Sequence, residues 1–267
     1  MENKIDRKLA GLKSSGTHGL MAHIVVGYPD LARSERLLDT LADSGADLIE
    51  LQVPFSDPLA DGPTIMTANL KALEAGVRVA DVFRFAEKAA GRLSGVPLLF
   101  MSYLNIPFNY GMEAFCRDSA AAGICGLIVP DIPPEETAEG YRGHCLDHGL
   151  HPVYILSPSS TEQRVRLIAS LAGGFIYCTA MVGITGARDK QQAGLQDFIS
   201  RVRAHTGLPL ALGFGISSRE HVLRAAGLAE VSVIGSKVID LYNQGASEED
   251  SLGRVSGFLR SLRGSAP

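Results

Sequence analysis

Short runs of apolar and often β-branched residues recur along the chain, and stretches with helical spacing of their apolar positions separate them. Runs that are apolar on both faces are typical of strands in a buried parallel sheet. The pattern predicts eight strands, over residues 20–26, 47–53, 96–102, 126–129, 152–156, 174–179, 208–212 and 231–234. Most of these runs start about twenty to thirty residues apart, the size of one strand–helix unit.

Eight such units close a barrel, so the sequence predicts an α/β protein built as one TIM (β/α)8 barrel. The chain has 267 residues, close to the roughly 250 that are typical of this architecture. No linker rich in Pro, Ser or Gly divides it. We therefore expect a single domain over residues 1–267.

Two segments lie outside the regular alternation. Ile5, Leu9 and Leu12 share one face of a predicted extra helix before the first strand. The interval between the second and third strands holds a loop of proline and acidic residues, 55–63, and then a helical stretch, 65–75. This inserted loop and helix follow the C-terminal end of a strand, where barrel enzymes build their active sites.

Composition and charge exclude several classes of function. The net charge of −4 and the scattered charges offer no basic surface for nucleic acid. No stretch is long and apolar enough to cross a membrane, and the charged N-terminus does not resemble a signal peptide, so we expect a cytoplasmic protein. The four cysteines lack C-x-x-C spacing and are expected to be reduced thiols. His144, His148 and His151 precede the fifth strand, away from the expected active site, and we predict no metal site.

Two carboxylates in residues 48–64 are the candidates for acid–base chemistry. Glu50 falls within the second strand, where a charge would be costly in the packed outer shell, so its side chain is expected to face the barrel interior. The alternative is a glutamate paired with arginine, but no predicted strand contains an arginine. Asp61 lies in the loop that follows, although Asp-Gly-Pro is also a good turn and helix-capping sequence.

Three glycine-containing turns follow the last three strands and predict a phosphate site. Backbone N–H groups at such turns, with the positive end of a helix dipole, bind phosphate in barrel enzymes. The candidates are Gly186, Gly215, Gly235 and Ser236. The alternative is that these glycines only permit tight turns. No predicted strand carries a lysine for a Schiff base, so carboxylates are the expected reactive groups, and any C–C cleavage needs a substrate that can hold its own electrons.

Several segments, in order, resemble the tryptophan synthase alpha subunit family. The run E-L-Q-V-P-F-S-D-P-L-A-D-G-P at residues 50–63 is similar to the family signature, with Gln52 where glycine is usual. Further similar segments are M-S-Y-L-N at 101–105, V-P-D-I-P-P-E-E at 129–136, G-I-T-G at 183–186 and G-F-G-I-S at 213–217. In the first strand, His23 stands where Phe or Tyr is more common, and Val25 where Thr is.

The resemblance implies retro-aldol cleavage of indole-3-glycerol phosphate to indole and glyceraldehyde 3-phosphate. It assigns the proton transfers to Glu50, and to Asp61 the indole N–H and the positive charge that develops there. Thr185 would hydrogen-bond Asp61. The residues expected to bind the substrate are Phe55, Leu99, Phe100, Tyr103, Leu127, Tyr177, Thr185 and Phe214.

The resemblance also implies a partner, a pyridoxal phosphate-dependent beta subunit that receives indole in an alpha2beta2 assembly. Residues 56–58 and 131–134 resemble the family's contact surfaces, and pyridoxal phosphate would belong to the partner, with no cofactor in this chain. Two alternatives are a stand-alone lyase that releases free indole and a weakly catalytic subunit that mainly regulates its partner.

Overall fold

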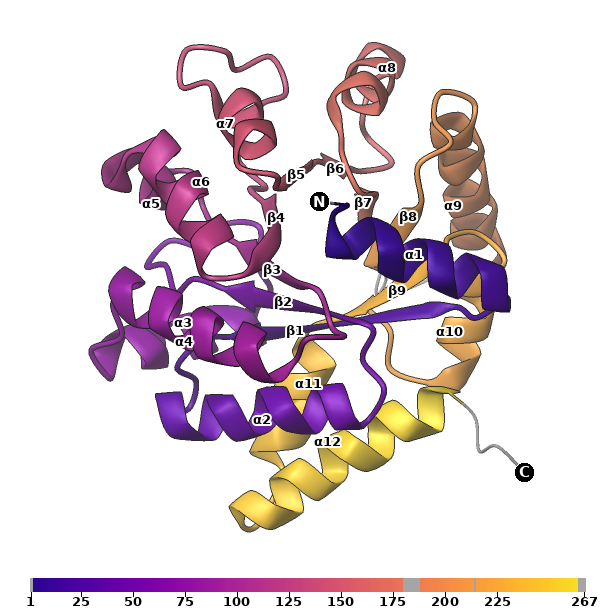
Figure 1. Ribbon diagram of the computed structural model, residues 1–267. Coiled ribbons are helices and arrows are strands. Elements are labelled where there is room, and N and C mark those ends of the chain that lie inside the picture. Colours follow the sequence, from indigo (N-terminus) through magenta and orange to yellow (C-terminus); the bar gives the residue numbers. More distant parts are fainter. Residues whose placement is uncertain (1, 180–187, 214, 264–267) are drawn as a thin grey trace.

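Nine parallel strands form one sheet that curves into a barrel (Figure 1). The computed structural model describes residues 2–179, 188–213 and 215–263, and the strands are counted within these ranges. Their order in the sheet is β5-β4-β3-β2-β1-β9-β8-β7-β6. The strands are β1 (Gly19–Val25), β2 (Leu48–Gln52), β3 (Leu98–Met101), β4 (Ile124–Ile128), β5 (His151–Val153), β6 (Ile155–Leu156), β7 (Ile176–Thr179), β8 (Leu210–Gly213) and β9 (Val231–Ile234).

The fifth strand, which we predicted to run without a break over residues 152–156, is divided into β5 and β6. Its two parts pair with different neighbours, β5 with β4 and β6 with β7. Tyr154 lies at the break, and its carbonyl accepts a hydrogen bond from Tyr177 N at 3.0 Å. The chain itself thus closes the sheet, and the predicted TIM-barrel fold is confirmed. Because every strand belongs to this sheet, we propose one domain for residues 1–267.

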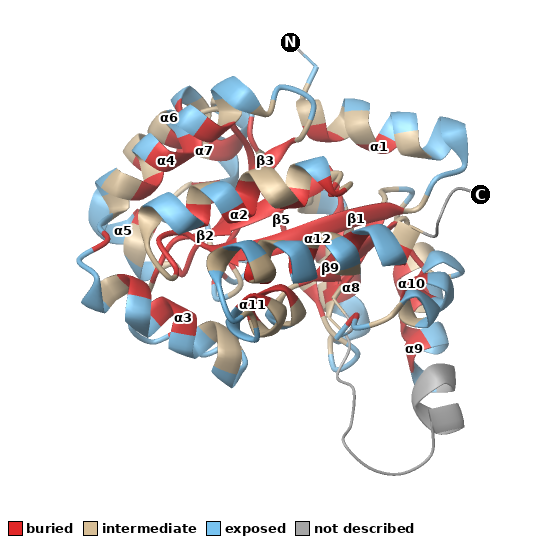
Figure 2. Cartoon of the chain, turned by 90° about the horizontal axis from the view of Figure 1, so that it is seen from below, coloured by how far each residue is buried: buried red, intermediate tan, exposed pale blue. Residues whose placement is uncertain are grey.

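Helices surround the barrel and present one apolar face to it (Figure 2). In Figure 2 the strands are buried, while the helices are buried only on the side that faces the sheet. No helix in the described ranges is long and apolar enough to cross a membrane. The helices are α1 (Lys4–Ser15), α2 (Leu31–Asp43), α3 (Pro63–Glu74), α4 (Val79–Arg92), α5 (Asn105–Tyr110), α6 (Met112–Ala121), α7 (Tyr141–Asp147), α8 (Glu162–Leu171), α9 (Arg188–Arg203), α10 (Arg219–Ala226), α11 (Ser236–Asn243) and α12 (Glu248–Arg263).

The predicted extra helix, α1, lies across the N-terminal end of the barrel (Figure 1). Asn3 caps it, since its Oδ1 accepts a hydrogen bond from Ile5 N at 2.9 Å. Ile5 and Leu9 are buried against apolar residues of the barrel interior, among them Met21, Leu48 and Leu99. This end of the barrel is therefore closed by apolar packing.

Alternation along the strands divides the core into two layers. In β2, Leu48 belongs to the interior cluster, whereas Ile49 and Leu51 belong to the outer cluster packed against the helices. Successive side chains of a strand point to opposite faces, so Glu50 and Gln52 share the inward face of Leu48. Both are buried polar side chains on a strand whose other residues are apolar.

The insertion after β2 consists of a loop, residues 53–62, and helix α3. Pro63 takes the first helical position of α3, where its missing N–H costs no intrahelical bond. Gly76 follows the end of the helix with φ +82°, a left-handed conformation that glycine adopts without strain. The predicted inserted helix is thus present, and it begins two residues earlier than residue 65.

Candidate active site

Glu50 and a histidine on the neighbouring strand form a buried pair at the C-terminal half of the barrel. The parallel register of β1 and β2 places His23 beside Glu50. His23 Nδ1 lies 3.1 Å from Glu50 Oε1, and the two residues are 4% and 3% exposed. The predicted inward orientation of Glu50 agrees with this placement, and its partner is an imidazole and not an arginine.

Opposing effects set the protonation of His23. Burial lowers the pKa of its imidazole, because a charged ring loses its hydration in the barrel interior. The carboxylate of Glu50, by its charge and its hydrogen bond, acts in the opposite direction. So do the charge of Asp61 and a hydrogen bond with the Gln52 side chain. The pKa of His23 is raised overall from its ordinary value of 6.5. The neighbouring carboxylates therefore favour the protonated form of the ring more than bulk water does.

Asp61 reaches the same interior from the loop and has its own partner. Gln52 Nε2 donates a hydrogen bond to Asp61 Oδ2 at 2.6 Å, and Gln52 is fully buried. Burial raises the pKa of Asp61, and Gln52, His23 and Tyr103 reduce the shift without cancelling it. The two carboxylates thus lie in one electrostatic environment, each with a separate hydrogen-bond donor.

The loop that carries Asp61 is anchored on both sides. Ala60 N donates a hydrogen bond to the hydroxyl of Tyr103 at 3.0 Å, just beyond the end of β3. The Phe55 ring stacks on the Tyr103 ring, with centroids 5.2 Å apart. Phe55 N in turn donates to Asn69 Oδ1 of α3 at 3.0 Å. Two aromatic rings therefore form a wall beside Asp61.

The first turn of α11 lies on another side of the same interior. A Cβ at Gly235 would come within 3.5 Å of Ile65 Cδ1 and 3.9 Å of His23 Cβ. No side chain caps the N-terminus of α11, whose first residue, Ser236, is exposed. Thr64 Oγ1 also donates to Asp240 Oδ1 at 2.9 Å, which ties α3 to α11. Free N–H groups at a helix start suit an anion.

Comparison with known proteins identifies the family. A family model described as tryptophan synthase alpha chain matches residues 9–264. A tryptophan synthase alpha chain from Syntrophotalea carbinolica is 46% identical over 244 residues, which cover 91% of this chain and 94% of the relative. One from a Roseiflexus species is 42% identical over 262 residues, 98% of this chain and 100% of the relative. The chain belongs to the tryptophan synthase alpha chain family.

Solved structures agree with this membership. The tryptophan synthase alpha subunit of Legionella pneumophila is 31% identical and superposes with a TM-score of 0.89, covering 98% of each chain. A chain of the tryptophan synthase structure from Mycobacterium tuberculosis is 32% identical with a TM-score of 0.88 and the same coverage. The resemblance predicted from the sequence motifs is therefore confirmed.

Not all the residues that we expected to bind the substrate face the interior of the barrel. Leu99 and Tyr177 belong to the interior cluster with Phe55 and Tyr103. Phe100 and Leu127 lie in the outer cluster, where Phe100 makes an edge contact with Phe83 of α4 at 5.6 Å between centroids. Phe100 and Leu127 therefore pack toward the helices and not toward the interior, where we expected them to bind the substrate. Both are apolar on apolar strands, so composition alone does not tell the faces apart.

Of the residues expected to bind phosphate, the structure describes three. Gly235 and Ser236 lie at the start of α11, and Gly215 has φ +60° in an exposed turn. Thr185, Gly186 and Phe214 lie outside the described residues. Gly213, in the same motif as Gly215, has a different role: a Cβ there would come within 3.0 Å of the Tyr177 ring.

Sequence reasoning missed His23, Gln52 and Asn69 as parts of the site. His23 and Gln52 had been noted only as departures from the family's usual residues. A signal for His23 was present, because it is the only His, Lys or Arg in the eight predicted strands and a buried carboxylate requires a partner. Gln52 follows Glu50 by two residues and therefore shares its face.

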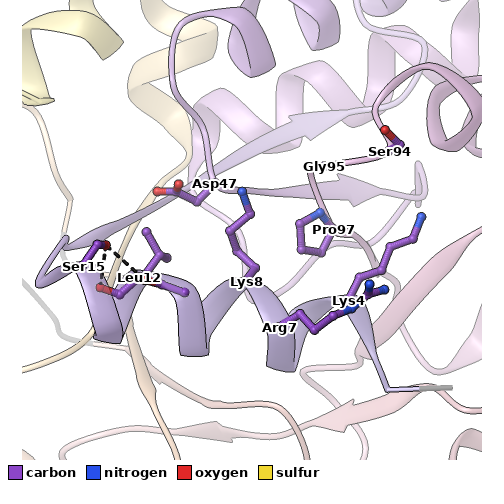
Figure 3. A pocket seen from close by; sticks show the side chains of 10 residues that line it. Lys4, Arg7, Lys8, Leu12, Ser15, Asp47, Ser94, Gly95 and Pro97 are labelled. Carbon is purple, nitrogen blue, oxygen red and sulfur yellow. Dashed lines mark hydrogen bonds between the residues drawn. The ribbon is translucent and has the colours of Figure 1, made fainter.

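A cavity of about 400 Å³ lies at the opposite end of the barrel, under α1. Figure 3 shows Lys4, Arg7 and Lys8 of α1 beside Asp47 and Pro97, which precede β2 and β3. This cavity is separate from Glu50 and Asp61, which lie toward the other end of the barrel. In the described ranges, no group of three or more His, Cys, Asp or Glu side chains forms a metal site.

Proposed function

We propose that this chain cleaves indole-3-glycerol phosphate to indole and glyceraldehyde 3-phosphate at the mouth of its barrel, as the alpha subunit of tryptophan synthase. Its family is one of lyases in tryptophan biosynthesis. The observation that carries the proposal is the arrangement of Glu50 and Asp61, two carboxylates in one buried environment with separate donors, His23 and Gln52.

The reaction needs a proton at indole C3 and the removal of one from the glycerol hydroxyl. The bond between C3 and the glycerol carbon then breaks, its electrons return to the indole ring, and the hydroxyl carbon becomes an aldehyde. A carboxyl group within hydrogen-bond reach of both positions can perform these transfers. We assign them to Glu50, which the strand holds in a fixed place.

Asp61 has the complementary role of an electrostatic partner. Protonation at C3 places positive charge on the indole nitrogen, and a carboxylate aimed at that N–H stabilises it. The aromatic wall of Phe55 and Tyr103 beside Asp61 offers a stacking surface for the ring, and Leu99 and Tyr177 add interior apolar surface. The resemblance counts all four among the residues expected to bind the substrate.

The phosphate group is assigned to the start of α11. Gly235 and Ser236 present N–H groups and a hydroxyl at the positive end of the helix dipole. Since Gly235 lies beside His23, a substrate with its phosphate there would extend its other end toward Glu50. Gly215 completes the proposed phosphate set, together with Gly186, which lies outside the described residues.

A beta subunit is the proposed protein partner, in an alpha2beta2 assembly. Large apolar side chains are exposed on the insertion: Leu59 is 91% exposed, and Met66 and Leu70, one turn apart on α3, are 44% and 56% exposed. Phe108 of α5 is 54% exposed. Exposed apolar residues around residues 56–58 support a docking surface there. Any pyridoxal phosphate would be bound by that partner, and we propose a cytoplasmic location for this chain, whose four cysteines are free thiols.

One assay tests the function and its alternatives. Purified protein is incubated with indole-3-glycerol phosphate, alone and with a tryptophan synthase beta subunit, and indole and glyceraldehyde 3-phosphate are measured. The proposal expects equal amounts of both products and a faster reaction with the beta subunit. Cleavage that the beta subunit does not accelerate would favour a stand-alone lyase, and absence of cleavage in both mixtures would favour a regulatory subunit.

A further inference from the structure

Three buried polar atoms at the barrel mouth have no hydrogen-bond partner among the described residues. They are His23 Nε2, Glu50 Oε2 and Gln52 Oε1. Each belongs to a side chain whose other polar atom is engaged, His23 and Glu50 with each other and Gln52 with Asp61. A buried polar group without a partner costs about 1–3 kcal/mol. The network is therefore not arranged for stability alone.

The pairing leaves the two oxygens of Glu50 unequal. A carboxylate oxygen accepts, so the 3.1 Å contact requires the hydrogen of His23 on Nδ1. This holds for the neutral ring with Nδ1–H and for the imidazolium, in which both nitrogens donate. Oε1 is then occupied in both states, while Oε2 keeps its lone pairs.

Rigid elements hold this geometry. His23 and Glu50 are directly paired in the register of β1 and β2, which is a central pair of the sheet. The side chains that flank them on the outward faces, Ile24 and Leu51, are 1% or less exposed in the outer core. A general acid–base residue is effective only if its reactive oxygen stays in place during the reaction.

We propose that His23 is a positioning residue for the cleavage reaction: its Nδ1–H holds Glu50 by Oε1 and leaves Oε2 as the oxygen that exchanges protons with the substrate. The inference rests on the proposed role of Glu50. It adds a residue that acts on the reaction through Glu50.

Two amide variants test the position of the donor. Asparagine places its amide N–H near the place of Nδ1, whereas glutamine places it nearer that of Nε2. We expect His23→Asn to keep kcat within about threefold of wild type, and His23→Gln and His23→Phe to lower it by about tenfold or more, a part of the 10²–10⁴ that a positioned acid–base group contributes. KM for indole-3-glycerol phosphate should change little in all three.

A pH profile provides a readout that a purely structural residue would not affect. The groups that act on His23 are Glu50 of β2 and Asp61 of the loop, and Tyr177 of β7 lies in the field of both carboxylates. The ring occupies Oε1 in both states, but loss of its proton removes a positive charge beside Glu50, and this changes proton transfer at Oε2. Wild-type kcat should therefore show an ionisation above pH 6.5, since the pKa of His23 is raised, and His23→Asn should lack it. His18→Asn is the matched control, because His18 contacts Ser232 Oγ at 2.8 Å on the outer side of the barrel.

The outcomes separate this inference from the function itself. Equal kcat values for the Asn and Gln variants, or a pH profile of His23→Asn identical to that of wild type, would overturn the positioning role. Should His23→Phe not fold, the Asn and Gln pair still decides the question. The function fails by a different result, the absence of cleavage by the wild-type protein with and without a beta subunit. The assigned role of Glu50 fails if Glu50→Gln keeps wild-type kcat, whatever His23 does.

Discussion

The two ends of this barrel are built on opposite principles. At the N-terminal end, Ile5 and Leu9 fill the interior. Asn3 Nδ2 there donates to the carbonyls of Cys125 and Gly149 at 2.8 and 2.9 Å. At the C-terminal end, charged and amide side chains are buried, and three of their polar atoms have no partner in the described ranges. The polar side chain of Asn3 is hydrogen-bonded at one end, whereas three polar atoms at the other end remain able to bind a ligand.

This difference indicates that the barrel separates stability from chemistry along its axis. Apolar packing beneath the site lowers the free energy of the folded state by the burial of side chains. The buried carboxylates at the mouth reduce that stability, because they would be more stable in water. Substitutions at the two ends should therefore differ in what they change, and the following predictions are ordered by expected size.

Glu50→Gln should break catalysis without breaking the fold. The amide is nearly isosteric and cannot transfer the proton, so we expect kcat to fall by about 10²–10⁴, with little loss in the free energy of unfolding. Steady-state kinetics and urea unfolding measure the two effects. Glu35→Gln on α2 is the control, since Glu35 lies 3.7 Å from Lys88 on the surface. Retention of more than about a tenth of wild-type kcat would contradict the assigned role.

Ile5→Ala should have the reverse effect at the other end. Ile5 is fully buried under the barrel, and its truncation is expected to lower the free energy of unfolding by about 2–5 kcal/mol. The value of kcat per folded molecule should stay unchanged. Leu223→Ala, at a site that is 62% exposed, is the control, and should change the stability by less than about 0.5 kcal/mol. A matching fall in kcat for Ile5→Ala would show that the two ends are not separable.

Gly235→Asp tests the phosphate site. The nearest atom to an added Cβ lies 3.5 Å away, an ordinary contact, so the main change is a negative charge at the start of α11. We expect the Kd of glycerol phosphate to rise by about tenfold or more, and that of indole to change little, as measured by calorimetry. Gly207→Asp is the control, because Gly207 precedes β8 at the opposite end and has open space around it. Equal weakening for both ligands would argue against a specific phosphate site.

Asp61→Asn should lower activity but not stability. Because burial raises the pKa of Asp61 in the folded protein, the folded state binds its proton more tightly than the unfolded chain does. Wild-type stability is therefore lost as the pH rises from the ordinary value of 3.8 through the raised one. Asp61→Asn has no carboxyl group to ionise and does not lose this stability. The free energy of unfolding of the variant minus that of wild type, measured with urea, should therefore increase between pH 4 and pH 7.

Asp118→Asn gives a control of opposite sign for this pH effect. Hydrogen bonds from Arg117 and Tyr110 lower the pKa of Asp118, so its contribution to stability is present above the ordinary value of 3.8 and is lost as the pH falls. The asparagine variant should therefore be slightly less stable than wild type at pH 7. A pH-independent difference for Asp61→Asn would show that Asp61 is solvated in the folded state.

Much of the fold was predictable, because the spacing of apolar runs records each strand–helix unit. The break at Tyr154 was not, since Pro152 lies two positions earlier, within β5, and only the pairing with β4 and β7 reveals where the strand divides. The faces of β3 were also ambiguous. Leu99 and Phe100 are both fully buried, and only the register with β2, which pairs Leu99 with the inward Glu50, shows which of them faces inward.

The candidate site was predictable where a residue violates the apolar pattern. Glu50 stood out as a charge within a strand, and its inward orientation followed. The partners of the carboxylates were harder to predict, because the pairing of His23 with Glu50 depends on strand register between segments 27 positions apart. Residues that support a site through tertiary contacts have no spacing of their own in the sequence.

The hydrogen bond from Thr64 to Asp240 joins the insertion to α11, the helix whose first turn is the proposed phosphate site, so we expect the two to be coupled. An anion that immobilises α11 also restrains α3, and with it the exposed Met66 and Leu70. Linkage is reciprocal, so any factor by which a docked protein tightens the binding of glycerol phosphate is also the factor by which glycerol phosphate tightens the binding of that protein. We expect the Thr64 hydroxyl to make the exposed face of α3 respond to an anion bound at the start of α11.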